Sequence, residues 1–175
     1  PSDTRTLTLA LTARMLRLGG LAKTDSDAHP LMEKALRSGA AFHTFTKMVR
    51  LHGGDPAFLE EPDAIEGRAA VKSMLSSPRT GWVSDVNAEA VGRAVLLLGA
   101  GRAKVEDRAD PDAGVCRLKK IGEPVEKGEP LAELHASTPG RIEAARPWME
   151  RAFQITETPP DNPPFLLEDL DSIGP

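Results

Sequence analysis

The chain has 175 residues, with 22 basic and 26 acidic side chains and a formal net charge of −4. Because the two signs are mixed along the chain, no basic stripe is available for nucleic acid or an anionic membrane surface. No apolar run approaches the roughly 20 residues that cross a bilayer, and the single cysteine, Cys116, allows no internal disulfide. The composition therefore predicts a cytoplasmic protein with neither a nucleic-acid nor a membrane partner.

Two amphipathic helices are predicted at the start of the chain. In residues 4–18, apolar side chains recur at steps of three and four, and Gly19-Gly20 ends the pattern. Residues 25–38 form the second helix, with Thr24 as its N-cap, although Pro30 leaves its first turn uncertain. The apolar faces contain Leu7, Ala10, Leu11, Met15 and Leu18 in the first helix, and Ala28, Leu31, Met32, Ala35 and Leu36 in the second.

A third helix is predicted over residues 40–52, where Gly53-Gly54 ends it. Its apolar side chains are expected to face inward: Ala41, Phe42, Phe45, Met48 and Val49. The following residues 55–66 contain prolines and acids but few large apolar side chains, as a linker would. We therefore predict a helical segment at 1–54, a linker at 55–66 and a second domain at 67–175.

The second domain is predicted to be α+β. Residues 69–75 and 81–86 have the pattern of strands, and a helix follows with Asn87 as N-cap and Gly99 as its end. Three further strand-like runs cover 114–119, 123–125 and 130–135. A last helix is expected over 141–153, kinked or restarted at Pro147, and Phe165 to Leu167 could add an edge strand.

Motifs that carry chemistry are absent from the sequence. The four histidines are far apart and the only cysteine lies in an alternating strand, where a small buried side chain is expected. Gly99-Ala100-Gly101 ends a helix, whereas a dinucleotide fingerprint opens one after a strand. Adjacent acids such as Glu60 and Glu61 are expected to be solvated charges. The residues alone predict no metal, no cofactor and no catalytic group.

A family resemblance extends over nearly the whole chain. Residues 81–102 (GWVSDVNAEAVGRAVLLLGAGR), 104–114 (KVEDRADPDAG) and 119–136 (KKIGEPVEKGEPLAELHA) resemble the C-terminal domain of thymidine and pyrimidine-nucleoside phosphorylases. Upstream, residues 31–56, including Phe45, Met48 and the sequence GGDP, resemble the same family. The resemblance implies a barrel-sandwich or hammerhead-like domain, preceded by helices left from the family's helical domain.

The resemblance also implies a function. Such enzymes are pentosyltransferases that cleave pyrimidine nucleosides with phosphate, releasing the base and a pentose 1-phosphate. The family's Lys-His-Ser-Thr-Gly-Gly phosphate motif and its base-binding residues do not occur in this sequence, so no catalytic residue is transferred. The chain, which begins at Pro1, is expected to be the inactive C-terminal piece of a homodimeric parent whose missing N-terminal part binds phosphate and nucleoside.

The stretch 99–112 is the only candidate functional segment, as a loop that closes over the parent's cleft. It combines flexible glycines with opposite charges and almost no apolar anchor. The candidate residues are Arg102, Lys104, Glu106 and Asp107. A solvated surface loop without a role explains the same composition.

Two other functions compete with the phosphorylase interpretation. Val125-x-x-Gly128-x-x-Leu131 also resembles hairpins of biotinyl and lipoyl carriers, but no lysine follows Leu131 at the position that a carrier requires. The shared pattern therefore indicates shared architecture, in which glycine serves the turn. A purely structural module is compatible with everything that the residues alone predict.

Overall fold

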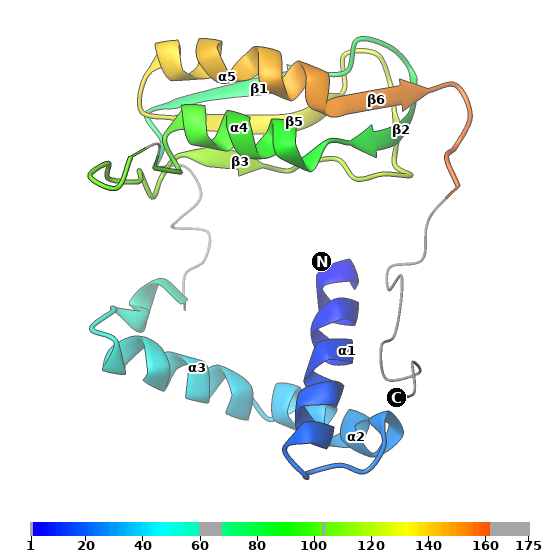
Figure 1. The fold of residues 1–175 in the computed structure, drawn as a ribbon, viewed down its shortest axis with the longest axis vertical. Helices are drawn as coiled ribbons and strands as arrows, with labels where there is room; N and C mark the ends of the chain where they lie inside the picture. The colour runs from blue at the N-terminus through cyan, green and yellow to red at the C-terminus, as the bar shows by residue number, and fades with distance from the viewer. Residues whose placement is uncertain (1, 60–67, 103, 162–175) are drawn as a thin grey trace. The chain divides into compact units, whose positions relative to one another are not determined.

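The computed structural model describes residues 2–59, 68–102 and 104–161. Over these residues the chain is α+β, as predicted (Figure 1). It divides into two compact units, of which the first includes residues 1–64 and the second residues 65–162. The predicted linker falls partly outside the described residues, and the edge strand expected at Phe165 to Leu167 lies wholly outside them. The domain boundaries stay a prediction.

The first unit consists of helices whose ends lie within two residues of the predicted ones. They are α1 (Ser2–Leu18), α2 (Asp25–Arg37) and α3 (Ala40–Leu51), followed by a 3-10 turn, η1 (Pro56–Leu59). Thr24 caps α2 as predicted: its hydroxyl accepts from the Asp27 N–H at 3.1 Å, and the Asp27 carboxylate accepts from the Thr24 N–H at 3.0 Å. Pro30 lies inside α2 without ending it, although it cannot donate a hydrogen bond to the Ser26 carbonyl.

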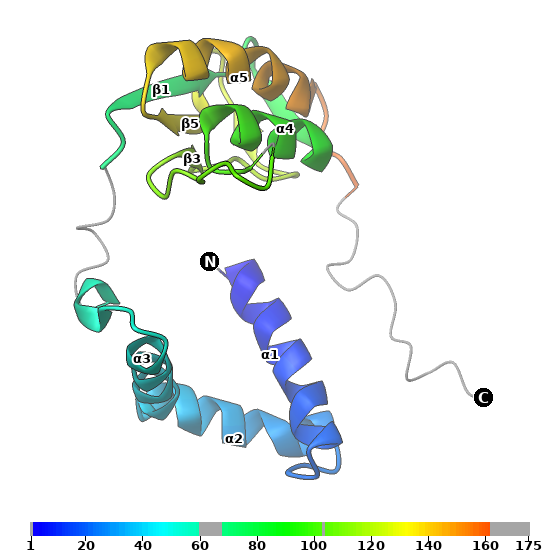
Figure 2. The ribbon, with the colours of Figure 1, turned by 60° about the vertical axis from the view of Figure 1, so that its left-hand side comes forward.

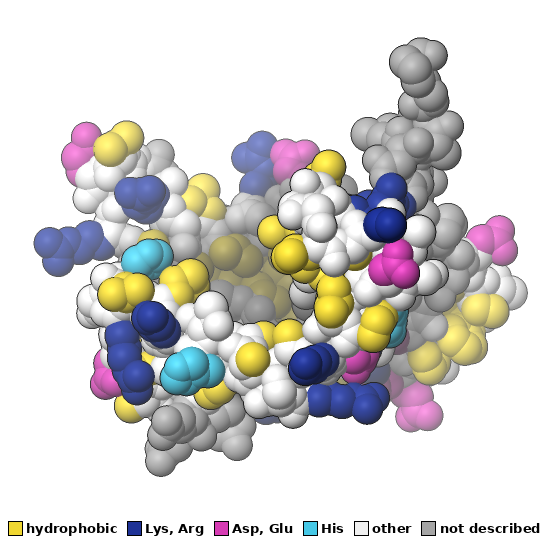
Figure 3. Space-filling view, turned by 90° about the horizontal axis from the view of Figure 1, so that it is seen from below, with side chains coloured by type: hydrophobic (Ala, Val, Ile, Leu, Met, Phe, Trp, Pro, Cys, Tyr) yellow, Lys and Arg dark blue, Asp and Glu magenta, His cyan; other side chains and the backbone are white. Residues whose placement is uncertain are grey.

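The core of the first unit is small. Ala13 of α1 packs against Ala28 and Met32 of α2, with Leu9, Leu16 and Ala22 around them. The predicted burial of α3 is wrong, because this helix has no buried residue and no described element covers its apolar face. Figure 3 shows hydrophobic side chains at the molecular surface. The exposed ones include Phe42, Phe45 and Met48 of α3, and Leu31 and Leu36 of α2.

The second unit contains two three-stranded antiparallel sheets. Its strands are β1 (Val71–Ser76), β2 (Gly81–Val86), β3 (Gly114–Cys116), β4 (Pro124–Val125), β5 (Pro130–Ala136) and β6 (Phe153–Thr156). One sheet has the order β1-β5-β3, and the other has the order β4-β2-β6. The helices α4 (Ala88–Leu98) and α5 (Pro139–Ala152) pack against each other, and α5 also contacts β1 and β5 (Figure 2).

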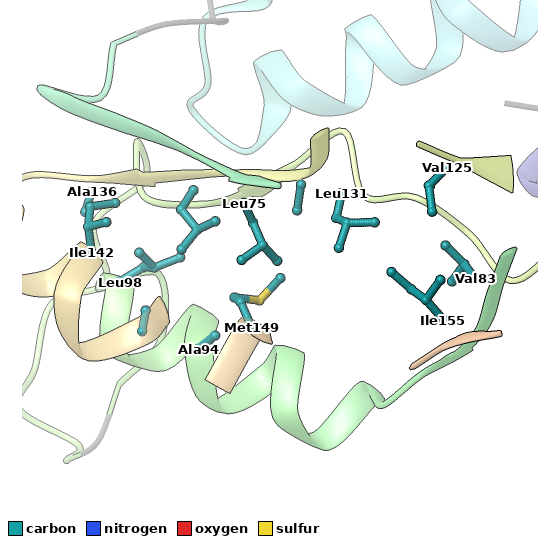
Figure 4. Close-up of a cluster of buried hydrophobic side chains, with 13 residues drawn as sticks. Leu75, Val83, Ala94, Leu98, Val125, Leu131, Ala136, Ile142, Met149 and Ile155 are labelled. Atoms are coloured by element: carbon teal, nitrogen blue, oxygen red, sulfur yellow. The ribbon is translucent and has the colours of Figure 1, made fainter. Parts of the chain in front are cut away.

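One contiguous core joins these elements. Leu75 of β1 and Met149 of α5 meet between the first sheet and the helices, and Val83 and Ile155 extend the cluster to the second sheet (Figure 4). Leu134 of β5 belongs to the same cluster. Alternate residues of a strand point to opposite faces, so Leu75 and Leu134 share the face that the helices cover. This core holds the ends of α4, β5 and α5 in place. The candidate loop of residues 99–112 starts at the end of α4.

A six-residue repeat forms the turns before β4 and β5, a feature that the sequence analysis missed. Lys120–Val125 and Glu126–Leu131 share the order x-x-Gly-Glu-Pro followed by Val or Leu. In each turn the glycine has φ 87° and the glutamate carboxylate accepts the N–H of the first residue, at 2.6 Å and 2.9 Å. The Pro that follows each turn leads to a buried side chain, Val125 or Leu131. The repeat therefore builds two equivalent turns from one local pattern.

An ion pair closes the base of this double turn. The Lys119 ammonium lies 2.8 Å from the Glu129 carboxylate. This hydrogen bond lowers the pKa of Glu129 and raises that of Lys119. Because the pKa of Glu129 is lowered in the folded state, the pair stabilises the fold above the ordinary glutamate range, and this contribution is lost on acidification.

Three local predictions in the second unit were wrong. Pro147 lies inside one continuous helix, α5, so the predicted restart there is wrong. This helix ends at Ala152, one residue before the predicted end, and Phe153 begins β6, which the sequence analysis did not predict. Cys116 is exposed rather than buried, because it points to the face of the sheet opposite Val115, which packs against the core.

Candidate functional site

The candidate loop starts where α4 ends. Gly99 has φ 111°, a left-handed conformation that favours glycine, and its carbonyl accepts the Asp110 N–H at 2.8 Å. A Cβ at position 99 would clash with the guanidinium of Arg141, which belongs to α5. The two ends of the loop are therefore tied together beside α4 and α5, and the segment between them projects from this base.

The four predicted site residues are all exposed. The structure brings two of them together, because the Lys104 N–H donates to the Asp107 carboxylate at 2.9 Å and the Asp107 N–H donates to the Lys104 carbonyl at 3.2 Å. The side chains of Arg102 and Glu106 form no hydrogen bond or ion pair with the described residues. These side chains are available to a partner, while the motion of the loop stays a prediction.

The chemistry open to this loop is electrostatic. A general acid, base or nucleophile needs a positioned partner within hydrogen-bonding reach, and exposed charges that are surrounded by water have weak mutual interactions. Over the ranges 2–59, 68–102 and 104–161, no group of three or more His, Cys, Asp or Glu could hold a metal ion. None of the described helices is both long and apolar enough to cross a membrane. The loop can therefore attract or orient a charged surface.

A second polar cluster, missed by the sequence analysis, lies on β5. Glu133 and His135 share the strand face opposite Leu134, and their side chains are only 13% and 10% exposed. Glu133 Oε1 lies 3.3 Å from His135 Nε2, a distance within ion-pair range, but the geometry does not form a hydrogen bond. Arg117 Nη1 lies 3.6 Å from Glu133 Oε2. The alternation of Glu133, Leu134 and His135 was the signal that could have found the pair.

Arg117 has an unusual backbone, with φ 53° immediately after β3. A side chain in this left-handed region is strained by roughly 1 kcal/mol relative to glycine. We expect Arg117→Gly to be more stable to urea than Arg117→Ala by about 1 kcal/mol, since both variants lose the same contacts with Glu133 and only glycine removes the strain. Equal unfolding midpoints for the two variants would contradict the left-handed backbone at this position.

The pyrimidine nucleoside phosphorylase C-terminal domain family matches residues 82–156, from β2 through β6. Residues 82–156 of the chain belong to this domain family. The matched range includes the candidate loop, the double turn and the Glu133–His135 pair. The family resemblance that the sequence analysis identified is thus confirmed, together with the α+β class.

Individual phosphorylases match a longer part of the chain. A thymidine phosphorylase from Burkholderia cenocepacia is 36% identical over 98% of this chain and 39% of its own length. A thymidine phosphorylase from Mesorhizobium japonicum is 35% identical over 88% of this chain and 35% of its own length. The pyrimidine-nucleoside phosphorylase of Bacillus subtilis is 36% identical over 78% of this chain and 31% of its own length. The chain therefore spans less than two fifths of the length of these phosphorylases, and none of the three is a biotinyl or lipoyl carrier.

Proposed function

We propose that this chain is the C-terminal part of an enzyme that cleaves pyrimidine nucleosides with phosphate, in a reversible reaction that gives the base and a pentose 1-phosphate. The phosphate and nucleoside sites then lie in polypeptide outside residues 1–175. The observation that supports this most is the match to thymidine phosphorylases over 98% of the chain but only 39% of their length. The parent is expected to be a cytoplasmic homodimer without a cofactor.

The physical requirements of the reaction support this division. Phosphorolysis needs an anion site, donors for the departing pyrimidine and a geometry that brings phosphate to the anomeric carbon. Among the described residues, the candidate loop is exposed and the Glu133–His135 pair is enclosed in a sheet face. Neither arrangement supplies a shielded site in which these three elements meet.

Purified residues 1–175 are therefore expected to release no thymine or uracil from thymidine or uridine above a protein-free blank. The measurement follows base release by chromatography in the presence and absence of phosphate. Co-expression with the N-terminal three fifths of the Burkholderia cenocepacia thymidine phosphorylase is expected to give phosphate-dependent release. Activity of the chain by itself would show that its own residues form a complete site, and this would overturn the proposal.

We also propose that the loop of residues 99–112 contributes to closure of the parent's cleft. Arg102 and Glu106 are exposed and form no hydrogen bond or ion pair with the described residues, which supports this role, because such charges can exchange water for partners on an opposing surface. A closing loop excludes water and completes a site, and its motion can limit turnover.

Replacing Arg102 and Lys104 by alanine in the longer enzyme is expected to lower turnover between about 2- and 30-fold. Each exposed pair contributes up to about 1 kcal/mol, so two pairs set this upper limit. Thermal stability should change little. The matched control is Lys120→Ala with Lys127→Ala, which removes the same charge from the double turn. Equal turnover in both double variants, where closure limits the rate, would leave the loop without a role.

A further inference from the structure

Helix α1 has two apolar faces on opposite sides. Leu9, Ala13 and Leu16 form the first face. At about 100° of rotation per residue, the mean direction of the second face lies about 170° from that of the first. The second face, called here the open face, consists of Leu7, Leu11, Met15 and Leu18. A helix at the surface of a protein normally has one apolar stripe and a polar opposite side. Helix α1 therefore has the pattern of a helix that is covered on both sides.

Only the first face is covered by described residues. Ala13 packs with Ala28 and Met32 of α2, and Leu9 and Leu16 pack against this cluster. The cations of α1 lie along the same seam. Arg14 and Arg17 each approach the Asp25 carboxylate to 3.2 Å, and Arg5 pairs with Glu33. Helix α2 thus packs against one apolar face of α1, and its carboxylates pair with these three arginines.

The open face is exposed to solvent and has charged residues along one edge only. Its four apolar side chains are exposed, by 36% at Leu7, 55% at Leu11, 69% at Met15 and 91% at Leu18. The uncharged Thr4 and Thr8 flank them on one side of the helix, and the charged Asp3 and Arg14, of which Arg14 pairs with Asp25, flank them on the other. A face that water covers gains by carrying charged side chains, and contiguous exposed apolar surface indicates an interaction site. The occupant must itself be largely apolar, because a charge buried against these four side chains would lose its hydration.

We propose that the open face docks onto the part of the phosphorylase polypeptide that precedes the matched region, so that α1 is an interior helix of the whole enzyme. This rests on the proposed function. The matched relatives have about three fifths of their length outside this chain, which is enough polypeptide to cover the face. Four contiguous apolar side chains fit a permanent interior contact, because permanent interfaces resemble a domain core.

A second copy of the chain is a weaker occupant on grounds of area. A buried leucine contributes about 2 kcal/mol at about 25 cal/mol per Å², which corresponds to about 80 Å² per side chain. Four such side chains cover about 320 Å² on each chain, whereas a stable dimer needs roughly 800 Å² per partner. A pair of open faces would therefore associate only weakly.

The test is co-expression of residues 1–175 with an affinity-tagged N-terminal three fifths of the Burkholderia cenocepacia thymidine phosphorylase. We expect capture of the wild-type chain in a 1:1 complex, and at least a tenfold lower recovery of the double variant Leu11→Gln and Met15→Gln. The control, Leu97→Gln with Ile121→Gln, removes two exposed apolar side chains from the second unit and should be captured like wild type. Alone, the open-face variant should keep the wild-type helical circular dichroism and bind less anilinonaphthalene sulfonate.

Four results would overturn the proposal. The first is failure to capture the wild-type chain, and the second is equal capture of the open-face variant. The third is a dimer of the wild-type chain, seen in light scattering, that the open-face substitutions convert to a monomer. The fourth is dye binding that these substitutions leave unchanged. Unchanged dye binding would indicate that the chain's own second unit covers the open face. Capture without phosphorolysis would contradict the proposed function while leaving the docking surface intact. Phosphorolysis that survives with the open-face variant would contradict the docking surface while leaving the proposed function intact.

Discussion

Replacing Gly81 by alanine is expected to destabilise the second unit by about 3 kcal/mol or more, the range of severe overpacking. Gly81 begins β2, and a Cβ there would overlap the Thr156 carbonyl oxygen and lie 2.9 Å from Ile155 Cγ2. The Thr156 carbonyl oxygen is a backbone atom. It can move only by separating β6 from β2, where Trp82 pairs with Thr156 and Val83 with Ile155.

The matched control for this substitution is Gly92→Ala. Gly92 lies within α4, and a Cβ there meets no atom within 4 Å. Alanine at this position should stabilise the fold by about 0.5–1 kcal/mol, because glycine costs helices about this much. Urea unfolding followed by circular dichroism measures both variants. If Gly81→Ala unfolded at the wild-type urea concentration, the close pairing of β2 with β6 would be wrong.

Truncation of Met149 to alanine should have an effect of similar size, a loss of about 2–5 kcal/mol in the free energy of unfolding. Met149 is fully buried and belongs to the cluster that joins α5 to both sheets. The loss combines the transfer of the removed atoms with the cavity that remains, since strands and helices on all sides cannot collapse into it.

Two comparison variants test the origin of this loss. Met149→Leu conserves volume and should cost less than about 1.5 kcal/mol, so it remains measurable even where Met149→Ala does not fold. Met74→Ala removes the same atoms from a side chain that is 42% exposed on β1, and it should cost far less. Guanidinium unfolding of the three variants gives the comparison. A loss at Met74 as large as that at Met149 would contradict the position of the core.

Local signals predicted most element ends in this chain. Thr24 and Asn87 have side chains that accept a hydrogen bond from the backbone N–H three residues later, and both cap helices. Gly99 tolerates a left-handed conformation, and α4 ends there. These contacts lie within a few residues of each other, so their energy depends little on the rest of the fold. The sequence resemblance similarly identified the family before any structural information was used.

Burial and pairing could not be predicted in the same way. The stripe of Phe42, Phe45 and Met48 indicates an amphipathic helix, but whether it is buried depends on a second surface that no described residue supplies. Phe153 continues the apolar spacing of α5, and only the presence of β2 beside it makes a strand of β6. The candidate loop shows the same limit: its charges were visible in the sequence, but the contact between Gly99 and Asp110 that ties its ends was not.

The sequence by itself determined the family, the α+β class and the positions of most helices and strands, because caps, turns and periodicity act over a few residues. Only the tertiary structure decided which face of each element is covered. Val115 packs against the core and Cys116 points to solvent although both belong to β3, and Glu133 lies beside Arg117 because β5 runs next to β3. Strand alternation determines that neighbours face opposite ways, but only the elements packed on a sheet determine which of its faces is covered.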